Sequence, residues 1–583
     1  HLLEGLPEGP DGLSPYLSGD GEVEVPYGSF PRWSPEAPVT FTVSTVLSRD
    51  GESIDHRETV SGFVTTRLLR ERDEFGESFE FEVNGRKRWI RGANWIPDHA
   101  FPALVDRERL RDRLLKAKDM GFDMLRVWGG GLYESDDFYE MCDELGILVW
   151  QDFPFACSYY PDDEPFRAVV REEAIAAVKR LRNHPCLALW CGNNENHEMF
   201  YNRWCGDRTP ARYYGLPLYD ETLPAVVNEF DPGRSYIPSS PIGTPPDEDG
   251  IDRKRKGPNA DLWGDQHNWD VWHGRGDWRY YTDSQGRFSS EYGFAASCSL
   301  SLWRETLGDV SALTPRSPEV VWHDKTGKGT ETFIGYVELH YPKQTDLESW
   351  VYYSQLNQRD ALRHGIEHYR RAPFCRGSLI WQFNDCWAVQ SWAAMDSDGQ
   401  YKALGYELKR LHADVLLTLE KSGSEFTLSV CNDGLEEEWV EPTIFAIDVR
   451  DGTVLRSAAA EEREWAPDER GVALVFDIAG LPATEVLVVA GREGGETFRL
   501  GEEPKNMKWP APEPIVASFD EGYLHLRTTQ PLVDLMLTEN GSTAPFDDDF
   551  VTLPTPGVHS IRLRYRPSTI EARSLAGKHE IRI

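Results

Sequence analysis

Between residues 79 and 413, short apolar runs alternate with longer amphipathic segments, and this alternation constrains the fold more than any other feature of the chain. A short apolar run between turn residues is typical of a buried strand, whereas apolar residues at i, i+3, i+4 and i+7 are typical of a helix. Strands that alternate with helices form a parallel sheet. The expected strands are 88–94, 124–128, 147–153, 187–191, 235–238, 262–267, 287–292 and 377–383.

This number of strands predicts a (β/α)8 barrel with insertions rather than an open, doubly wound sheet. The helix signals agree with the strand assignments. Asp106 is placed to cap one helix, and Gly121 and Gly146 follow the last periodic residues of the first two helices. A long helix is expected over 346–369, before the last strand.

Alternating β-type runs punctuated by Gly and Pro flank the barrel on both sides, and they predict immunoglobulin-like β-sandwich domains. The fold class is therefore multidomain, α/β and all-β, with a (β/α)8 TIM barrel between sandwiches. The expected domains are 1–20, a linker or tail; 21–78, a partial immunoglobulin-like sandwich; 79–413, the barrel; 414–505, a β-sandwich; and 506–583, a C-terminal immunoglobulin-like sandwich.

The charge balance limits the partners. With 62 Lys and Arg against 97 Asp and Glu, the net charge of −35 repels phosphate backbones and anionic membrane surfaces. No apolar run reaches the roughly 20 residues that a bilayer span needs. The stretch from His1 to Tyr16 lacks a signal-peptide layout. We expect a soluble protein without nucleic-acid or membrane partners, cytoplasmic rather than secreted or lysosomal, although a start at His1 leaves export open.

Neither the cysteines nor the histidines predict a metal. The nine cysteines are odd in number and contain no CxxC pair, which is unlike a disulfide framework or a zinc ribbon. His197 and Glu198 begin like the zinc motif HExxH, but Tyr201 stands at the second histidine position. We therefore expect no metal site from these residues.

Two glutamates stand at the ends of predicted barrel strands. Glu195 comes just after the strand 187–191, and Glu291 lies near the end of 287–292. In a (β/α)8 barrel the active site is built at this end of the strands. Two carboxylates about 5 Å apart can attack an anomeric carbon and protonate the leaving oxygen of a glycoside. An ordinary salt-bridged Glu is the alternative for each, but the polar and aromatic residues around both favour catalysis.

The motifs around these strand ends resemble glycoside hydrolase family 2, and within it the β-mannosidases. They are 92–97 (GANWIP), 125–131 (LRVWGGG), 190–196 (WCGNNEN), 290–294 (SEYGF) and 381–387 (WQFNDCW). The resemblance implies a sandwich, barrel, sandwich arrangement and a retaining double displacement without metal or organic cofactor. Its implied substrate is a β-mannoside or manno-oligosaccharide, cleaved at the terminal non-reducing β-D-mannose.

The resemblance also assigns roles. Glu195 resembles the general acid/base, Glu291 the nucleophile, and Asn194 the residue that holds the sugar 2-hydroxyl. The other residues that it places around the terminal mannose are Trp128, Asp152, His267, Trp269, Trp381 and Asn384. Core packing is the alternative role for the three tryptophans, and a structural hydrogen bond is the alternative for the histidine.

Other functions share these motifs. Another family 2 activity, such as an endo-β-mannosidase, exo-β-glucosaminidase or β-glucuronidase, would use the same carboxylate pair, and nitrophenyl glycosides would distinguish them. A non-catalytic carbohydrate-binding protein would bind sugar without turnover. Family 2 enzymes usually begin with a sugar-binding-like sandwich and a complete second sandwich, yet only residues 1–78 precede the barrel here. A complementing N-terminal domain or chain is therefore an expected partner.

Overall fold

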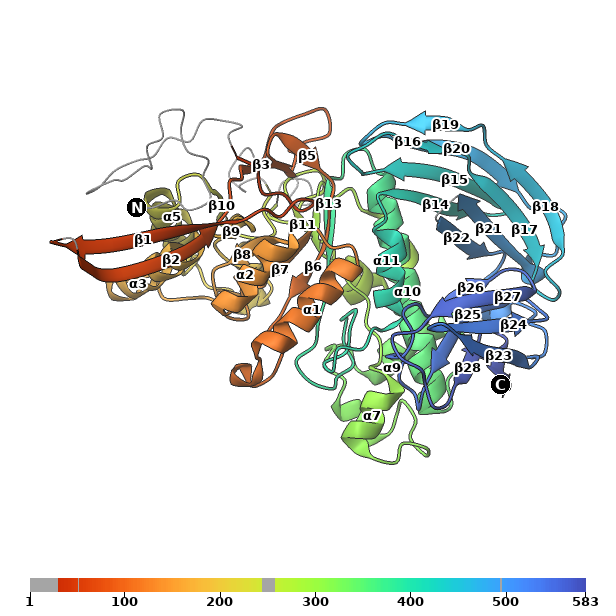
Figure 1. Ribbon diagram of the computed structural model, residues 1–583. Helices are drawn as coiled ribbons and strands as arrows, with labels where there is room; N and C mark the ends of the chain where they lie inside the picture. Colours follow the sequence, from red (N-terminus) through yellow and green to blue (C-terminus); the bar gives the residue numbers. More distant parts are fainter. Residues whose placement is uncertain (1–29, 51, 244–256, 493–494) are drawn as a thin grey trace.

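The computed structural model describes residues 30–50, 52–243, 257–492 and 495–583 (Figure 1), so the expected tail 1–20 lies outside the described residues. Eight parallel strands form one sheet in the order β10-β9-β8-β7-β6-β13-β12-β11. This sheet confirms the predicted barrel. The strands are β6 (Ile90–Trp95), β7 (Met124–Val127), β8 (Leu148–Asp152), β9 (Leu187–Cys191), β10 (Ser235–Ile237), β11 (Gln266–His267), β12 (Ser289–Glu291) and β13 (Gly377–Ile380).

The helices begin and end at the predicted signals. Asp106 accepts a hydrogen bond from the Arg109 backbone N–H at 2.8 Å, and Gly146 ends the second helix with a left-handed φ of 69°. None of the described helices combines the length and apolar character that a membrane crossing requires. The helices are α1 (Arg107–Asp119), α2 (Asp136–Leu145), α3 (Glu164–Leu181), α4 (Asn196–Tyr201), α5 (Leu223–Phe230), α7 (Leu300–Leu307), α8 (Pro318–Trp322), α9 (Thr330–Glu338), α10 (Leu347–Arg371) and α11 (Ala403–Leu411).

One strand is much shorter than the sequence predicts. The expected strand 262–267 is reduced to β11, because Leu262 and Gly264 take left-handed φ angles of 65° and 62°. A Cβ atom on Gly264 would lie 1.7 Å from the carbonyl oxygen of Ile242, so only glycine permits this close approach. The apolar pattern does not reveal a backbone contact of this kind.

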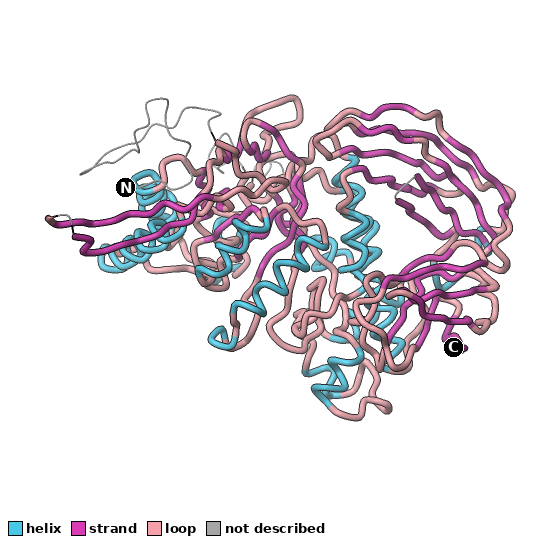
Figure 2. Tube along the Cα trace, in the orientation of Figure 1, coloured by secondary structure: helices cyan, strands magenta, loops and turns pink. Residues whose placement is uncertain are grey.

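The segment before the barrel has two parts. Strands β1 (Phe41–Arg49) and β2 (Glu52–Ser61) form an antiparallel ribbon that projects from the body of the molecule (Figures 1 and 2). Strands β3 (Thr66–Leu69), β4 (Glu80–Val83) and β5 (Arg86–Arg88) form a small sheet. Beside it, the Phe79 ring packs 5.7 Å from Trp150 and 5.2 Å from Phe288. A sandwich over 21–78 and a complementing N-terminal domain stay predictions.

Two groups of β-sheets follow the barrel (Figure 2), and each group has buried hydrophobic residues that form a core of their own. The first contains β14 (Val415–Ser422), β15 (Glu425–Asn432), β16 (Glu438–Val440), β17 (Thr443–Asp448), β18 (Val454–Ala459), β19 (Arg463–Trp465), β20 (Arg470–Asp477), β21 (Val486–Arg492) and β22 (Gly495–Leu500). The second contains β23 (Ile515–Asp520), β24 (Tyr523–Thr528), β25 (Leu532–Thr538), β26 (Val551–Leu553), β27 (Gly557–Arg562), β28 (Glu571–Ser574), β29 (Gly577–His579) and β30 (Ile581–Arg582), the last of which pairs in parallel with β23. The domain limits predicted at 414, 505 and 506 stay predictions.

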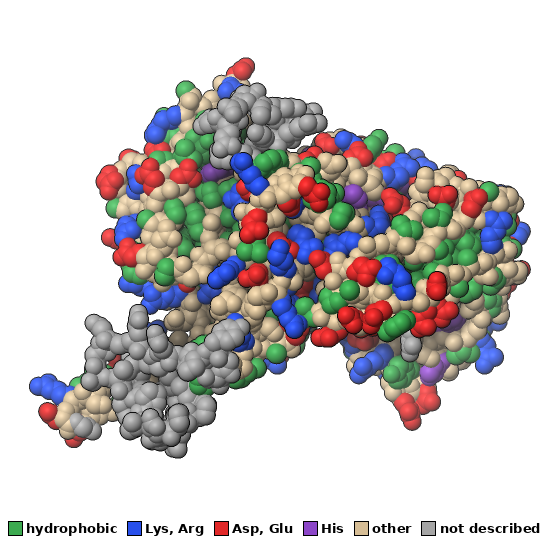
Figure 3. Space-filling view, turned by 90° about the horizontal axis from the view of Figure 1, so that it is seen from above, with side chains coloured by type: hydrophobic (Ala, Val, Ile, Leu, Met, Phe, Trp, Pro, Cys, Tyr) green, Lys and Arg blue, Asp and Glu red, His purple; other side chains and the backbone are tan. Residues whose placement is uncertain are grey.

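Acidic side chains spread over the face shown in Figure 3, where they are intermixed with basic ones. The exclusion of nucleic acid rests on the net charge and stays a prediction.

A buried ion pair joins the barrel to the first group of sheets. The Arg370 guanidinium of α10 donates to Asp433 at 2.6 Å, and neither side chain is exposed to solvent. Arg370 also donates to the carbonyl oxygens of Leu411 and Ala413, at 2.6 and 2.8 Å. One side chain thereby fixes the end of α11 and the loop after β15 against α10.

Arg370→Met should lower the free energy of unfolding by about 3 kcal/mol, because it leaves several buried carbonyl groups without their donor and leaves the buried Asp433 carboxylate with Arg470 as its remaining arginine partner. Thermal and urea unfolding followed by circular dichroism would measure the change. Arg582→Ala is the matched control, since its pair with Glu580 is exposed and its loss should cost less than about 1 kcal/mol. Equal shifts for the two variants would contradict the assigned role of Arg370.

Candidate active site

Three strand ends bring the central side chains together. Glu195 follows β9, His267 ends β11 and Glu291 ends β12. One carboxylate oxygen of each glutamate and one imidazole nitrogen all lie within 4.8 Å of one another, and all three side chains are buried. The structure therefore unites both predicted carboxylates and the predicted histidine at the carboxyl end of the barrel strands.

The backbone around Glu195 directs its side chain into this cluster. Glu195 has a left-handed φ of 62°, and its N–H donates to the carbonyl oxygen of Ser240 at 2.7 Å. The Ser240 N–H in turn donates to the Asn193 carbonyl oxygen at 2.9 Å. The loop after β9 is thus fixed to the loop after β10, which holds Glu195 in a conformation that L residues seldom adopt.

Arg126 of β7 lies at the centre of the site and is fully buried. Its Nη1 donates to Glu291 Oε1 at 2.6 Å and to Asn94 Oδ1 at 3.0 Å. Its Nη2 donates to Asp152 Oδ2 at 2.8 Å and to Asn194 Oδ1 at 2.7 Å. A single guanidinium therefore connects four strand ends, and it does so with the fork of donors that only arginine offers.

The two oxygens of Glu291 accept hydrogen bonds from different donors, an arginine and an indole. Trp269 Nε1 donates to its Oε2 at 3.1 Å, opposite the Arg126 contact. Burial raises the pKa of Glu291 above its ordinary value, while His267 and Arg126 act in the opposite direction. The ion pair with Arg126 favours the charged carboxylate at neutral pH, which is the form that can attack as a nucleophile.

Glu195 has a different environment. Its Oε1 lies 2.7 Å from Nδ1 of His267, and its Oε2 accepts from the Cys157 thiol at 3.3 Å. Burial raises the pKa of Glu195 to about 6, and burial lowers the pKa of His267 to about 4. At neutral pH the imidazole is uncharged, and the raised pKa lets Glu195 keep its proton to a higher pH than an ordinary glutamate, as a general acid requires.

Tryptophan rings form one side of the site. The rings of Trp128 and Trp381 meet edge to face with centroids 5.1 Å apart, and the Trp269 ring lies 6.4 Å from Trp381. All three side chains are partly exposed, so they are available to a ligand. The structure places these predicted residues together beside the carboxylates.

Asp152 and Asn384 are more enclosed, since both are almost completely buried. Asp152 accepts from Arg126, from the Gly129 N–H at 3.0 Å and from Trp150 Nε1 at 2.9 Å. The Asn384 side-chain amide accepts from the backbone N–H of Ile96 and donates to its carbonyl oxygen, and Ile96 lies just after β6. These contacts fit a positioning role, and their predicted contact with sugar stays a prediction.

Three residues of the site were not singled out from the sequence: Asn94, Arg126 and Cys157. Arg126 had a signal, since a charged side chain in a short apolar strand is costly unless it is paired. Cys157 had none, because it lies in the loop after β8 and reaches Glu195 only through the fold.

The cluster of Glu195, His267 and Glu291 also has the spacing of a cation site. The Arg126 guanidinium, however, already places a fixed positive charge against Glu291. A divalent cation would have to displace it or bear its repulsion. The guanidinium therefore disfavours a divalent cation at this cluster.

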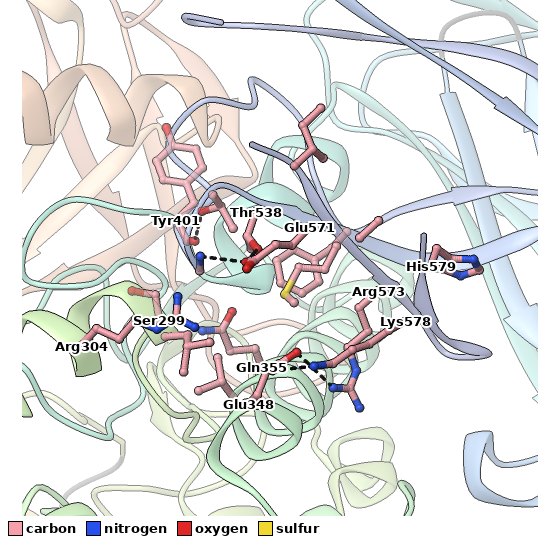
Figure 4. Close-up of a pocket in the computed structure, with 18 residues that line it drawn as sticks. Ser299, Arg304, Glu348, Gln355, Tyr401, Thr538, Glu571, Arg573, Lys578 and His579 are labelled. Carbon is pink, nitrogen blue, oxygen red and sulfur yellow. Dashed lines mark hydrogen bonds and ion pairs between the residues drawn. The ribbon is translucent and has the colours of Figure 1, made fainter. Parts of the chain in front are cut away.

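A separate cavity of about 280 Å³ lies between α7, α10 and the C-terminal sheets (Figure 4). Figure 4 shows Glu348 beside Lys578 and Arg573, and the corresponding ion-pair distances are 2.8 and 3.7 Å. Glu571, on the other side, accepts from Thr538 at 2.8 Å. None of the predicted site residues lines this cavity, which is part of the interface between the barrel and the sheets.

Comparisons with known proteins identify the family. No family model matches the chain. "Beta-mannosidase B" of Aspergillus fumigatus is 32% identical over 408 residues, which cover 67% of this chain and 46% of that protein. The Aspergillus niger protein of the same name is 34% identical over 410 residues, which cover 67% and 47%. The chain thus spans about half the length of these curated relatives.

A solved structure covers more of the chain. The crystal structure of the β-D-mannosidase of Dictyoglomus thermophilum superimposes with a TM-score of 0.86 and 33% identity, covering 95% of this chain and 68% of that one. Together with the strand-end carboxylates and their motifs, these similarities show that the chain belongs to the β-mannosidases of glycoside hydrolase family 2.

Proposed function

We propose that the site hydrolyses terminal non-reducing β-D-mannose residues with retention of configuration. The observation that carries the proposal is the carboxylate pair, whose oxygens lie within 4.8 Å of each other in opposite environments. Retaining glycosidases separate their carboxyl groups by about 5–5.5 Å, whereas inverting enzymes leave room for a water molecule. Mannose as the sugar is supported by the relatives named β-mannosidases.

The chemistry would proceed in two displacements. Glu291 attacks the anomeric carbon while the glycosidic bond breaks, and the proton of Glu195 goes to the leaving oxygen. The resulting ester links the sugar to Glu291. Glu195, now ionised, takes a proton from water, whose oxygen attacks the anomeric carbon and releases Glu291.

The neighbouring residues fit this sequence of steps. Arg126 stabilises the Glu291 carboxylate before attack and after release. The Asn194 side-chain nitrogen donates to the Cys157 sulfur at 3.4 Å, a long contact that a sugar 2-hydroxyl could replace. The rings of Trp128, Trp269 and Trp381 offer apolar faces to the pyranose.

The two carboxylates can be told apart by the product that azide forms. Glu195→Ala should lower turnover of substrates with poor leaving groups by about 10²–10⁴-fold, and it should form β-mannosyl azide from an activated substrate. Glu291→Ala cannot form the ester, so azide should attack directly and give α-mannosyl azide. NMR of the products decides, and exchanged anomers would mean that the roles are reversed. Glu198→Ala, which removes a neighbouring half-buried acid, is the control and should yield no azide adduct.

A plot of activity against pH should be bell-shaped. Activity falls as the pH rises through the Glu195 pKa, which burial places at about 6, because the acid loses its proton. Activity also falls at low pH, as Glu291 becomes protonated. Burial raises the pKa of Glu291, so this acidic limb should lie at a higher pH than the ordinary pKa of a glutamate would give. Measuring kcat/KM against pH on an aryl β-mannoside tests both limbs. The profile should be the same with and without a chelator, and activity restored by a divalent ion would contradict this assignment.

Trp381→Ala should lower kcat/KM by about ten- to a hundredfold, because it removes one apolar face of the sugar pocket. Steady-state kinetics on a panel of nitrophenyl glycosides would measure the loss and the sugar preference together. Trp439→Ala is the matched control, since that indole is 63% exposed on β16. If the Trp381 variant behaves like the Trp439 variant, the assignment of Trp381 to the sugar pocket is wrong. If the enzyme prefers another sugar, the assignment of mannose as the substrate is wrong.

A further inference from the structure

His267 is enclosed by hydrogen-bonding groups, and the position of its proton decides what it does to Glu195. Its Nδ1 lies 2.7 Å from Glu195 Oε1, and its Nε2 lies 2.9 Å from the hydroxyl oxygen of Ser240. A neutral imidazole carries a proton on only one nitrogen. His267 therefore either donates to Glu195 or accepts from it.

The Ser240 hydroxyl has one proton to donate, and its partners show where that proton goes. It donates to Asp265 Oδ2 at 2.6 Å. Asp265 acts here as an acceptor, since it also takes the Ser290 hydroxyl at 2.6 Å and the Ile242 N–H at 2.6 Å. Because the Ser240 hydroxyl points its proton toward Asp265, it presents only lone pairs to His267. The imidazole proton must then be on Nε2.

This tautomer leaves a lone pair on Nδ1, and a contact of 2.7 Å between that lone pair and Glu195 needs a proton on the carboxyl group. The other Glu195 oxygen accepts from the Cys157 thiol, which fits the carbonyl oxygen of a neutral acid. Ser240 and Asp265 are fully buried, so bulk water has no access to the hydrogen bond between them.

We propose that Ser240 and Asp265 are positioning residues that fix the Nε2–H tautomer of His267 and thereby keep the proton on Glu195 until the glycosidic oxygen takes it. The inference rests on the proposed function, because it assigns how the general acid is held in its protonated form. It also gives His267 a part in the second displacement. Once Glu195 is ionised it faces the Nδ1 lone pair, and this repulsion strengthens it as the base that takes a proton from water.

Several other titratable or charged groups face Glu195 and His267. They are Arg126 from β7, Cys157 after β8, Glu198 from α4, Asp265 before β11 and Glu291 from β12. Arg126 and Glu291 form an ion pair, and Glu291 Oε2 lies 3.4 Å from Nδ1 of His267, farther than the 2.7 Å that separates Nδ1 from Glu195 Oε1. Burial raises the pKa of Glu198 to about 8, so this acid is mostly uncharged at neutral pH. The Ser240 hydroxyl remains as the group that selects the tautomer.

Ser240→Ala removes the hydroxyl and keeps the backbone contacts that hold Glu195. His267 can then place its proton on Nδ1 and donate to Glu195, which stabilises the ionised carboxylate. The alkaline limb of kcat/KM for a substrate with a poor leaving group should move to lower pH by about one unit. Asp265→Asn should move it in the same direction, because its amide can donate to Ser240 and turn the hydroxyl proton toward Nε2.

Two controls separate this effect from a general disturbance. Ser290→Ala removes the other hydroxyl on the same Asp265 oxygen but leaves the contact between Ser240 and His267, so its alkaline limb should stay at the wild-type pH. An activated leaving group needs no protonation, so the shift should vanish with such a substrate. An alkaline limb that does not move in folded Ser240→Ala and Asp265→Asn proteins would overturn the inference.

The tautomer of His267 can also be measured directly, without a substrate. Nitrogen NMR of the protein labelled in its histidine rings should show His267 with a protonated Nε2 and a bare Nδ1, with the signals assigned by their loss in His267→Gln. In Asp265→Asn the spectrum should instead show a protonated Nδ1 and an unprotonated Nε2. If no β-mannoside is hydrolysed, the proposed function fails while this spectrum still tests the tautomer. A protonated Nδ1 in the wild-type protein would overturn the inference even in an active enzyme.

Discussion

The active-site geometry depends on the buried guanidinium of Arg126. Its acceptors come from β6, β8, the loop after β9 and β12, so no one of these strand ends can move without losing a charge-assisted hydrogen bond. Breaking a buried pair of this kind by removing one partner costs about 3–5 kcal/mol. The carboxylate of Glu291 is therefore held in position before any substrate arrives, which is the condition for electrostatic preorganisation.

The same guanidinium separates the two glutamates chemically. Glu291 contacts Arg126 directly, whereas Glu195 faces an uncharged imidazole and a thiol. The ion pair with Arg126 favours the charged form of Glu291, whereas burial beside an uncharged imidazole favours the neutral form of Glu195. The barrel supplies this asymmetry by placing each glutamate at the end of a different strand.

Much of this arrangement could be predicted from the sequence, but not its internal contacts. The alternation of strand and helix patterns predicted the barrel, and the motifs at the strand ends directed attention to Glu195, Glu291 and His267. Local patterns carry such information because each strand end is a local feature. Ser240 and Asp265 carry no motif of their own, and their roles arise only because the loop after β10 lies against the approach to β11. The shortened β11 has the same origin, since the close approach of Gly264 to Ile242 is a contact between distant segments.

These contacts also explain why the proton chemistry lies where it does. Among the described residues, β10 and β11 end the strand order of the barrel, and no backbone ladder joins them. Side chains bridge this seam instead: Ser240 contacts both Asp265 and His267, and the Ile242 N–H donates to Asp265. A backbone ladder fixes only main-chain groups, whereas a seam closed by side chains can carry a defined chain of donors and acceptors. The hydrogen bonds that bridge this seam are thus the same ones that, in our proposal, determine which nitrogen of His267 carries the proton.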